Sequence, residues 1–297
     1  MTKIKPPSKI QNWLIASRPK TLLASIVPVM VGSALAINEN KFVIVYSVIA
    51  VLCSILIQIG TNFVNDLYDF LKGADNEKRK GPLRVLANGF ISVNEMKVGS
   101  VLVFLTSFLM GLYLVYVGGI VVFIIGILSI IAGIAYTAGP YPLAYNGLGD
   151  MFVFAFFGLV GTMGTYYVQT HEFTSLSFLV SIPVGALITN ILVVNNYRDI
   201  EEDRSANKNT LAVIFGKTFT RSQYILLLIA SFIIPIVLFI NYHFSYWIFL
   251  PCLTLPFGIN LIKMLFTLEG TELNKALELS AKFSALFGTL FSIGLIL

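Results

Sequence analysis

Long, continuously apolar runs alternate with polar connections along the 297-residue chain. A helix needs about 20 mostly apolar residues to cross a bilayer. Nine runs of this kind predict spans at 21–37, 42–66, 98–116, 119–138, 150–169, 175–195, 223–241, 245–264 and 277–296. Because the runs do not alternate in polarity, helices are favoured over barrel strands. The pattern predicts an all-α membrane protein with nine transmembrane helices in one polytopic domain, 1–297.

Composition excludes a soluble protein. Hydrophobic residues make up 57% of the chain and charged residues 12%, and the mean hydropathy is +0.84. A water-soluble globule of this size needs a larger polar coat than that. Cys53 and Cys252 both lie in apolar runs, which gives no indication of a disulfide framework or a zinc cluster. His171 and His243 are expected to be loop residues with no catalytic part.

The basic residues predict the orientation in the membrane. The formal charge of +5 could suggest nucleic acid, but in a membrane protein an excess of Lys and Arg usually sets topology. With nine spans, nearly all Lys and Arg outside the spans fall on one side, and only Lys41 lies in a loop on the other. We therefore expect a cell (inner) membrane protein with its N-terminus and long loops in the cytoplasm, its C-terminus outside, and no nucleic-acid partner.

Two long polar loops, roughly 67–97 and 196–222, follow two similar motifs. The first motif runs Asn65-Asp66-Leu67-Tyr68-Asp69 and the second Asn195-Asn196-Tyr197-Arg198-Asp199, so Asn-x-x-x-Asp recurs at the end of two even-numbered spans. Matched motifs in two halves suggest an internal repeat with a site between the halves. The expected halves are about 12–140 and 141–265, with 277–296 as a last helix.

The spacing of these motifs indicates divalent-metal chemistry. Residues four apart share one helix face, so Asn65 points with Asp69, and Asn195 with Asp199 and Asp203. Two such oxygen-rich clusters at the cytoplasmic mouth would suit magnesium, which completes its shell with phosphate oxygens and water. The cations expected to hold those phosphate oxygens are Lys72, Arg79, Arg84, Arg198 and Lys208. The alternative is two solvated, orientation-setting loops, which leaves the paired Asn-x-x-x-Asp motifs unexplained.

With these motifs in place, the sequence resembles the UbiA-type intramembrane prenyltransferases, and more closely their 1,4-dihydroxy-2-naphthoate branch. The family is marked by aspartate-rich motifs after the second and sixth of nine helices. The matching stretches are Arg18-Pro19-Lys20-Thr21-Leu22, Asn65 to Phe70 with Lys72 to Asp75, Gly81 to Arg84, Tyr136 to Pro140, Gly147 to Asp150, and Asn195 to Asp203 with Lys208, Thr210 and Leu211. The likeness runs from about residue 12 to the seventh span and fades after it.

The resemblance implies a UbiA-like bundle around a central cavity that opens at the cytoplasmic face. It further implies Mg2+-dependent transfer of a polyprenyl chain from polyprenyl diphosphate to 1,4-dihydroxy-2-naphthoate, with decarboxylation, giving demethylmenaquinone in menaquinone biosynthesis. The implied metal positions are Asn65, Asp66, Asp69, Asp75, Asp199 and Asp203, of which Asn65, Asp69, Asp199 and Asp203 are the expected catalytic residues. Asp75 follows Asp69 by six residues, a spacing shared with the naphthoate branch, whereas Asn207 departs from that branch's usual glycine.

Several further residues are candidates for substrate binding, each with a structural alternative. Arg18 and Lys20 could hold the acceptor's carboxylate or simply set topology. Tyr136 and Tyr141 could line the ring pocket or belong to an interfacial aromatic belt. Asp150 could contact substrate or favour the dipole of the helix it opens. Asn195 and Asn196 complete the set expected to bind substrate.

Two other functions remain open from the sequence. One is a sister prenyltransferase acting on another aromatic acceptor, such as 4-hydroxybenzoate, homogentisate or protohaem. The other is an ion-coupled transporter whose carboxylates bind cations at a repeat interface. A transporter would prefer acidic residues near the bilayer midplane, whereas here they gather at one face, which favours the enzyme.

Overall fold

The computed structural model describes residues 8–73, 81 and 83–297, and in that part of the chain the regular structure is helical throughout. The helices are α1 (Lys9–Ser17), α2 (Pro19–Asn38), α3 (Ile44–Leu71), α4 (Val93–Ala135), α5 (Gly149–Val153), α6 (Gly164–Thr170), α7 (Ser175–Arg198), α8 (Ile200–Ser205), α9 (Leu211–Tyr242), α10 (Leu255–Thr267) and α11 (Leu273–Ile296). A π-helix, Phe154–Met163, joins α5 to α6, and 3-10 turns lie at Leu143–Tyr145, Tyr246–Thr254 and Gly270–Glu272.

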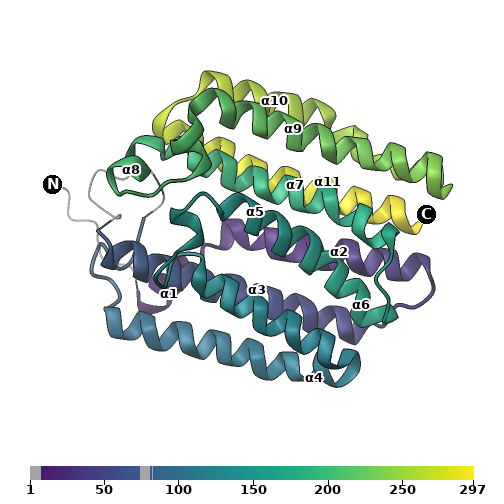
Figure 1. Ribbon diagram of the computed structural model, residues 1–297, viewed down its shortest axis with the longest axis horizontal. Coiled ribbons are helices and arrows are strands. Elements are labelled where there is room, and N and C mark those ends of the chain that lie inside the picture. Colours follow the sequence, from purple (N-terminus) through teal and green to yellow (C-terminus); the bar gives the residue numbers. More distant parts are fainter. Residues whose placement is uncertain (1–7, 74–80, 82) are drawn as a thin grey trace.

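Eight helical segments of the described chain are long and apolar enough to span a membrane. The longest of them is α4, whose 43 residues would extend about 64 Å as a straight helix, roughly twice a bilayer's hydrocarbon thickness. Gly119 breaks it with φ 66° and ψ −155°. The chain turns back there (Figure 1), and the two arms of α4 pack together: a Cβ built at Gly133 on the second arm would lie 3.8 Å from the ring of Phe104 on the first. The predicted spans 98–116 and 119–138 fall on these two arms, and the total of nine stays a prediction.

Two boundaries differ from the sequence prediction for local reasons. Helix α1 was not predicted, since nine residues are too few for a span; it begins at a Ser8–Gln11 capping box and ends at Arg18, which is left-handed with φ 53°. Helix α9 begins at Leu211 rather than 223, because Thr210 caps its start, whereas Lys217 and Arg221 interrupt the apolar run on which the prediction depended; Gly216, with φ 78°, kinks the helix between the two.

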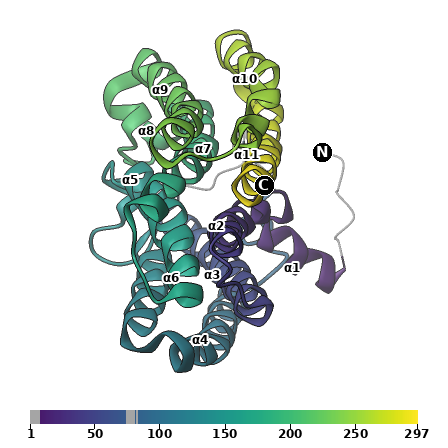
Figure 2. The same ribbon diagram turned by 90° about the vertical axis from the view of Figure 1, so that its right-hand side faces the viewer.

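The helices lie side by side in one elongated bundle. Figure 1 shows α1 and α8 at one end of the bundle and the C-terminus at the other. Viewed end-on, α2, α3, α4 and α6 form one group and α7 to α11 another, with α2 and α11 meeting between them (Figure 2). Both aspartate motifs come from helices that finish at the α1 and α8 end.

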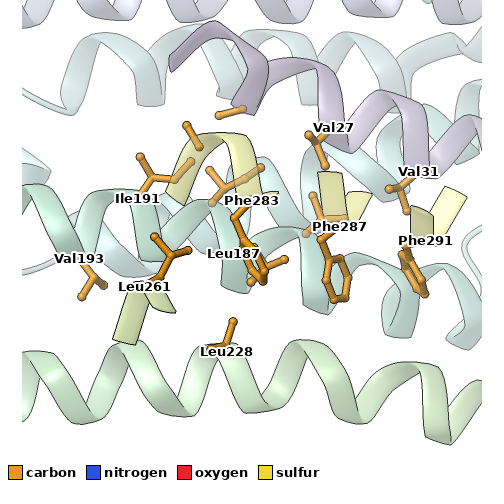
Figure 3. Packing of buried hydrophobic residues seen from close by; sticks show 14 of the residues in the cluster. Val27, Val31, Leu187, Ile191, Val193, Leu228, Leu261, Phe283, Phe287 and Phe291 are labelled. Carbon is orange, nitrogen blue, oxygen red and sulfur yellow. The ribbon is translucent and has the colours of Figure 1, made fainter. Parts of the chain in front are cut away.

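The largest hydrophobic cluster holds the second motif's helix in place. Figure 3 shows Val27 and Val31 of α2 facing Phe287 and Phe291 of α11. The backbones approach closely, since a Cβ added at Gly288 would lie 2.5 Å from Val27. Side chains of α7 and α9 complete this cluster. Close packing of this kind fixes the position of α7, and with it the motif at its end.

Candidate active site at the end of the bundle

The first motif occupies the last turns of α3 and is buried. Asp69 accepts two hydrogen bonds, one on each oxygen: Tyr145 Oη donates to Oδ1 at 2.8 Å and Arg84 Nη2 to Oδ2 at 3.0 Å. Asn65 Oδ1 accepts from Thr137 Oγ1 at 2.7 Å. Residues beyond α4, distant in sequence, therefore set the orientation of both Asn65 and Asp69.

Asp66 and Lys72 face different surroundings from Asn65 and Asp69. Asp66 pairs with Arg84 Nη1 at 3.5 Å, so a single buried guanidinium bridges both aspartates of the motif. Lys72 donates to the Thr137 carbonyl at 2.8 Å, and its Nζ lies 4.2 Å from the centre of the Tyr145 ring. Burial lowers the pKa of Lys72, while the charge of Asp69 opposes that shift.

The second motif lies at a bend between α7 and α8. Asp199 leaves the helical region with φ −97° and ψ 10°, and its carboxylate is held by both Nε and Nη2 of Arg198 at 2.6 Å each. Arg198 also donates to Asn195 Oδ1 at 2.9 Å and to Asn274 Oδ1 of α11 at 2.6 Å. Arg198 was expected to bind the diphosphate, and that role stays a prediction; in the structure its side chain is 0% exposed and donates to Asp199 and the two asparagines.

Asp203 and Lys208 connect the two motifs electrostatically. Their side chains lie 3.2 Å apart, both largely buried. Burial raises the pKa of Asp203 to about 6, against the opposing charge of Lys208. Burial lowers the pKa of Lys208, but the carboxylates of Asp203, Asp69 and Asp199 outweigh it and the net pKa is raised. Side chains of both motifs line one cavity, and Lys72 and Lys208 lie at the same Tyr145 ring, so the two motifs converge.

A cavity of about 1070 Å³ begins at these residues and continues into the bundle. Its polar end is lined by side chains from both motifs and their partners: Arg18, Asn65, Asp69, Arg84, Asn195, Asn196, Asp199, Asp203 and Lys208. Its remainder is mostly apolar, between α3, α4 and the α5–α6 segment, with lining residues that include Ile57, Phe108, Val115, Phe123, Ile130, Phe156 and Val160. The cavity therefore has a charged end that leads into a long apolar interior.

The other expected site residues divide between this cavity and its surroundings. Arg18, Lys20 and Tyr136 line it, and Lys20 pairs with Glu278 at 2.7 Å. Tyr141 is 60% exposed and does not line the cavity. Asp150 is buried outside the lining, near enough to Tyr136 that its charge adds to burial in raising the pKa of that phenol.

Some predicted positions fall elsewhere or outside the described chain. Asp75 and Arg79 lie outside the described residues. His171 and His243 cap the ends of α6 and α9, one full spanning helix away from the second motif. Both histidines are thus remote from the site, as the sequence analysis expected of loop residues.

Three residues at the site were missed by sequence reasoning: Thr137, Tyr145 and Asn274. Thr137 falls inside the fourth predicted span, 119–138, and Tyr145 in the connection after it, where no residue type or spacing distinguished them from their neighbours. Asn274 lies in a segment with no motif at all. The signal that identifies them is contact with Asp69, Asn65 and Arg198, which only the folded chain supplies.

The donor set suits a hard divalent cation, although the carboxylates are paired with cations. In the described part of the chain, no three His, Cys, Asp or Glu side chains cluster closely enough to hold a metal as they stand. Asp69, Asp199 and Asp203 instead contact Arg84, Arg198 and Lys208. Asp203 Oδ2 is buried without a hydrogen-bond partner, an arrangement that is costly unless a cation or donor completes it. All-oxygen ligands of this kind fit magnesium.

Comparison with known proteins identifies the family. Residues 25–286 match the model of the UbiA prenyltransferase family. The chain is 38% identical to 1,4-dihydroxy-2-naphthoate octaprenyltransferase of Haemophilus influenzae, covering 97% of both chains. It is 35% identical to the enzyme of the same name from Escherichia coli, covering 98% of this chain and 96% of that one.

The fold is also that of solved members of this group. A UbiA homolog from Archaeoglobus fulgidus, bound to GPP and Mg2+, superposes with a TM-score of 0.71 over 96% of this chain and 99% of that chain, at 18% identity. At 18% identity this similarity establishes the fold alone. Family match, fold and apolar helices together make this an integral, multi-pass membrane protein, and the chain belongs to the UbiA prenyltransferase family.

Proposed function

We propose that the protein transfers a polyprenyl chain from polyprenyl diphosphate to 1,4-dihydroxy-2-naphthoate, with Mg2+ as cofactor, giving the prenylated hydroquinone, whose separate two-electron oxidation yields demethylmenaquinone. One observation carries the proposal: carboxylates and cations from both motifs alternate at the charged end of a cavity whose interior is apolar. The names of the relatives from Haemophilus influenzae and Escherichia coli support the naphthoate as acceptor.

The charged end is suited to a metal–diphosphate group. Asn65, Asp69, Asp199 and Asp203 line it and would hold magnesium. Asp66, which pairs with Arg84 outside the lining, and Asp75, which lies outside the described residues, are further acidic members of the first motif. When bound, magnesium supplies positive charge that stabilises the departing diphosphate. Arg84 and Lys208 line the same end and can exchange their carboxylate partners for phosphate oxygens. Arg198 contributes by holding Asp199 rather than by touching phosphate.

The apolar interior is suited to the prenyl tail. Ile57, Phe123 and Phe156 are among the side chains that offer it a lining without charge. A tail bound there would hold the first carbon of the prenyl group beside the motifs, and the walls would exclude water from an allylic cation. In the reaction the bond from this carbon to the diphosphate oxygen breaks. The ring carbon forms the new carbon–carbon bond, and the acceptor's carboxylate leaves as carbon dioxide.

The acceptor would bind at the charged end, beside the diphosphate. Arg18 and Lys20 line the cavity there and offer cationic partners for a carboxylate, while Tyr136 offers a ring face. Asn195 and Asn196 supply amides for the phenolic hydroxyls. Tyr141 and Asp150 lie outside the lining and are not part of this proposed subsite.

We place this charged end in the cytoplasm. Arg18, Lys20, Arg84, Arg198 and Lys208 all belong to it, whereas Lys41 follows α2 at the far end. The positive-inside rule assigns the richer side to the cytoplasm. Both proposed substrates would then enter from the inner leaflet or the cytosol.

One assay tests the proposed reaction. Purified protein would be incubated with Mg2+, farnesyl diphosphate and 1,4-dihydroxy-2-naphthoate, and the products identified by mass spectrometry. Prenylated product that has lost carbon dioxide supports the proposal. Prenylation of 4-hydroxybenzoate or homogentisate in its place would move the protein to another acceptor class, and absence of any Mg2+-dependent product would overturn it.

A further inference from the structure

Tyr145 contacts the first aspartate motif and the loop that follows the second, through three different parts of the residue. Its hydroxyl donates to Asp69 Oδ1 of the first motif at 2.8 Å. Its ring lies 4.2 Å from Lys72 Nζ and 5.7 Å from Lys208 Nζ, one lysine following each motif. Its carbonyl accepts from the amide of Asn209 at 3.0 Å. A single side chain and its peptide therefore join two loops that are far apart in sequence.

The backbone around Tyr145 makes this junction rigid. Tyr145 ends the 3-10 turn Leu143–Tyr145, and the Ala144 amide donates to the Tyr136 carbonyl at the end of α4 at 2.9 Å. The next residue, Asn146, forms an isolated parallel bridge with Asn209. Tyr145 is 8% exposed. The turn is thus anchored to α4 on one side and to the loop after α8 on the other.

Each contact of Tyr145 fixes something that metal–diphosphate binding needs. With Arg84 on one oxygen and Tyr145 on the other, the Asp69 carboxylate is held in one rotation. Hydrogen bonds to charged groups are stronger than neutral ones. An aromatic face attracts nearby ammonium groups. The ring thus holds Lys208, which lines the charged end of the cavity, and Lys72, which follows the first motif outside the lining.

We infer that Tyr145 is a positioning residue: it orients Asp69 for the metal and keeps Lys72 and Lys208 in place for the diphosphate. This inference rests on the proposed function. The two roles separate by chemistry, because the hydroxyl serves Asp69 and the ring serves the lysines. Removing the hydroxyl alone should weaken Mg2+ binding, whereas removing the ring should weaken diphosphate binding as well.

The experiment uses the full-length protein in detergent with Tyr145→Phe and Tyr145→Leu. Tyr116→Phe is the matched control, since Tyr116 is 87% exposed and lies in α4 just before the break at Gly119, at the other end of the bundle. Binding of farnesyl diphosphate is measured by calorimetry at several Mg2+ concentrations, beside turnover and thermal unfolding. We expect Tyr145→Phe to require roughly tenfold more Mg2+ for half-maximal binding, with the affinity for farnesyl diphosphate at saturating Mg2+ nearly unchanged.

Tyr145→Leu should show the same Mg2+ requirement and, in addition, weaker farnesyl diphosphate binding at saturating Mg2+. If Tyr145→Leu does not fold, Tyr145→Phe alone decides, because it keeps the ring and the packing. A Mg2+ requirement for Tyr145→Phe equal to that of wild type and Tyr116→Phe would overturn the inference. Wild-type protein that binds farnesyl diphosphate with Mg2+ but does not prenylate the naphthoate would instead count against the proposed acceptor and leave the role of Tyr145 intact.

Discussion

Arg198 grips the carboxylate of its own neighbour, Asp199, with Nε and Nη2 each 2.6 Å from a different oxygen. The arginine side chain is 0% exposed and that of Asp199 7%, so the pair is desolvated. Asn195 and Asn274 accept from its remaining donors. The second motif is therefore organised before any substrate binds.

Arg198→Gln should lower both the stability and the activity of the protein. Breaking a buried ion pair by removing one partner typically costs about 3–5 kcal/mol, because the other charge is left unpaired. Arg198→Lys should also lower turnover, since an ammonium cannot reproduce the two-point contact. Thermal unfolding and product formation measure the two effects. Arg204→Gln is the control, because its pair with Glu201 is exposed; equal effects of both variants would contradict the buried-pair interpretation.

Asp69→Asn and Asp199→Asn should abolish turnover while the protein still folds in membranes, at reduced stability because Arg84 or Arg198 loses the charge of its buried partner. Asparagine keeps the shape of each side chain but removes the charge that a divalent cation requires. Activity is measured by mass spectrometry of the prenylated naphthoate, and folding by size-exclusion chromatography in detergent. Glu201→Gln, on the exposed side of α8, serves as the control carboxylate. Turnover at the wild-type rate in either aspartate variant would remove that aspartate from the metal site.

Mg2+ binding should weaken as the pH falls through about 6. Burial raises the pKa of Asp203 to that value, so below it the carboxyl carries a proton that must leave before a metal can bind. For one proton the apparent affinity should fall about tenfold per pH unit below the pKa. Calorimetric Mg2+ titrations at pH 7.5, 6 and 5, each in two buffers, report affinity and proton release. Identical affinities across this range would show that no such proton is displaced.

Filling the apolar cavity should discriminate against long tails. Gly126 lines it, and a Cβ built there meets no atom of the described chain within 4 Å. Gly126→Leu should therefore fold normally and lower turnover with long prenyl diphosphates more than with dimethylallyl diphosphate. Ile120→Phe is the control, since Ile120 is 68% exposed and outside the lining. The measurement is turnover against tail length, and an unchanged ratio would place the tail elsewhere.

Cysteine labelling tests the orientation. In a background with Cys53→Ala and Cys252→Ala, Glu201→Cys reports the charged end and Tyr116→Cys the far end; both native side chains are well exposed. A membrane-impermeant maleimide added to intact cells should label Tyr116→Cys and reach Glu201→Cys only after lysis. The reverse pattern would place the charged end outside.

The membrane class, most helix positions and the family could be predicted from the sequence, because each depends on local properties. Apolar runs of bilayer length indicate spans wherever they occur. Asn-x-x-x-Asp places Asn65 with Asp69 on one helix face whatever the rest of the chain does. The same reasoning failed at α9, where Lys217 and Arg221 end the apolar run although the helix itself begins at Leu211.

The contacts that make the site specific could not be predicted in this way. The neighbours of Arg198 in sequence suggest a phosphate ligand, yet in the folded chain its buried side chain contacts Asp199 and Asn274, a residue 76 positions away. Tyr145 reaches Asp69 across the same separation. The sequence by itself determined a membrane bundle with two acidic motifs, since those depend on hydrophobicity and helical spacing. Only the tertiary structure decided which cation holds which carboxylate, because that depends on which helix ends the packing of α2, α7 and α11 brings together.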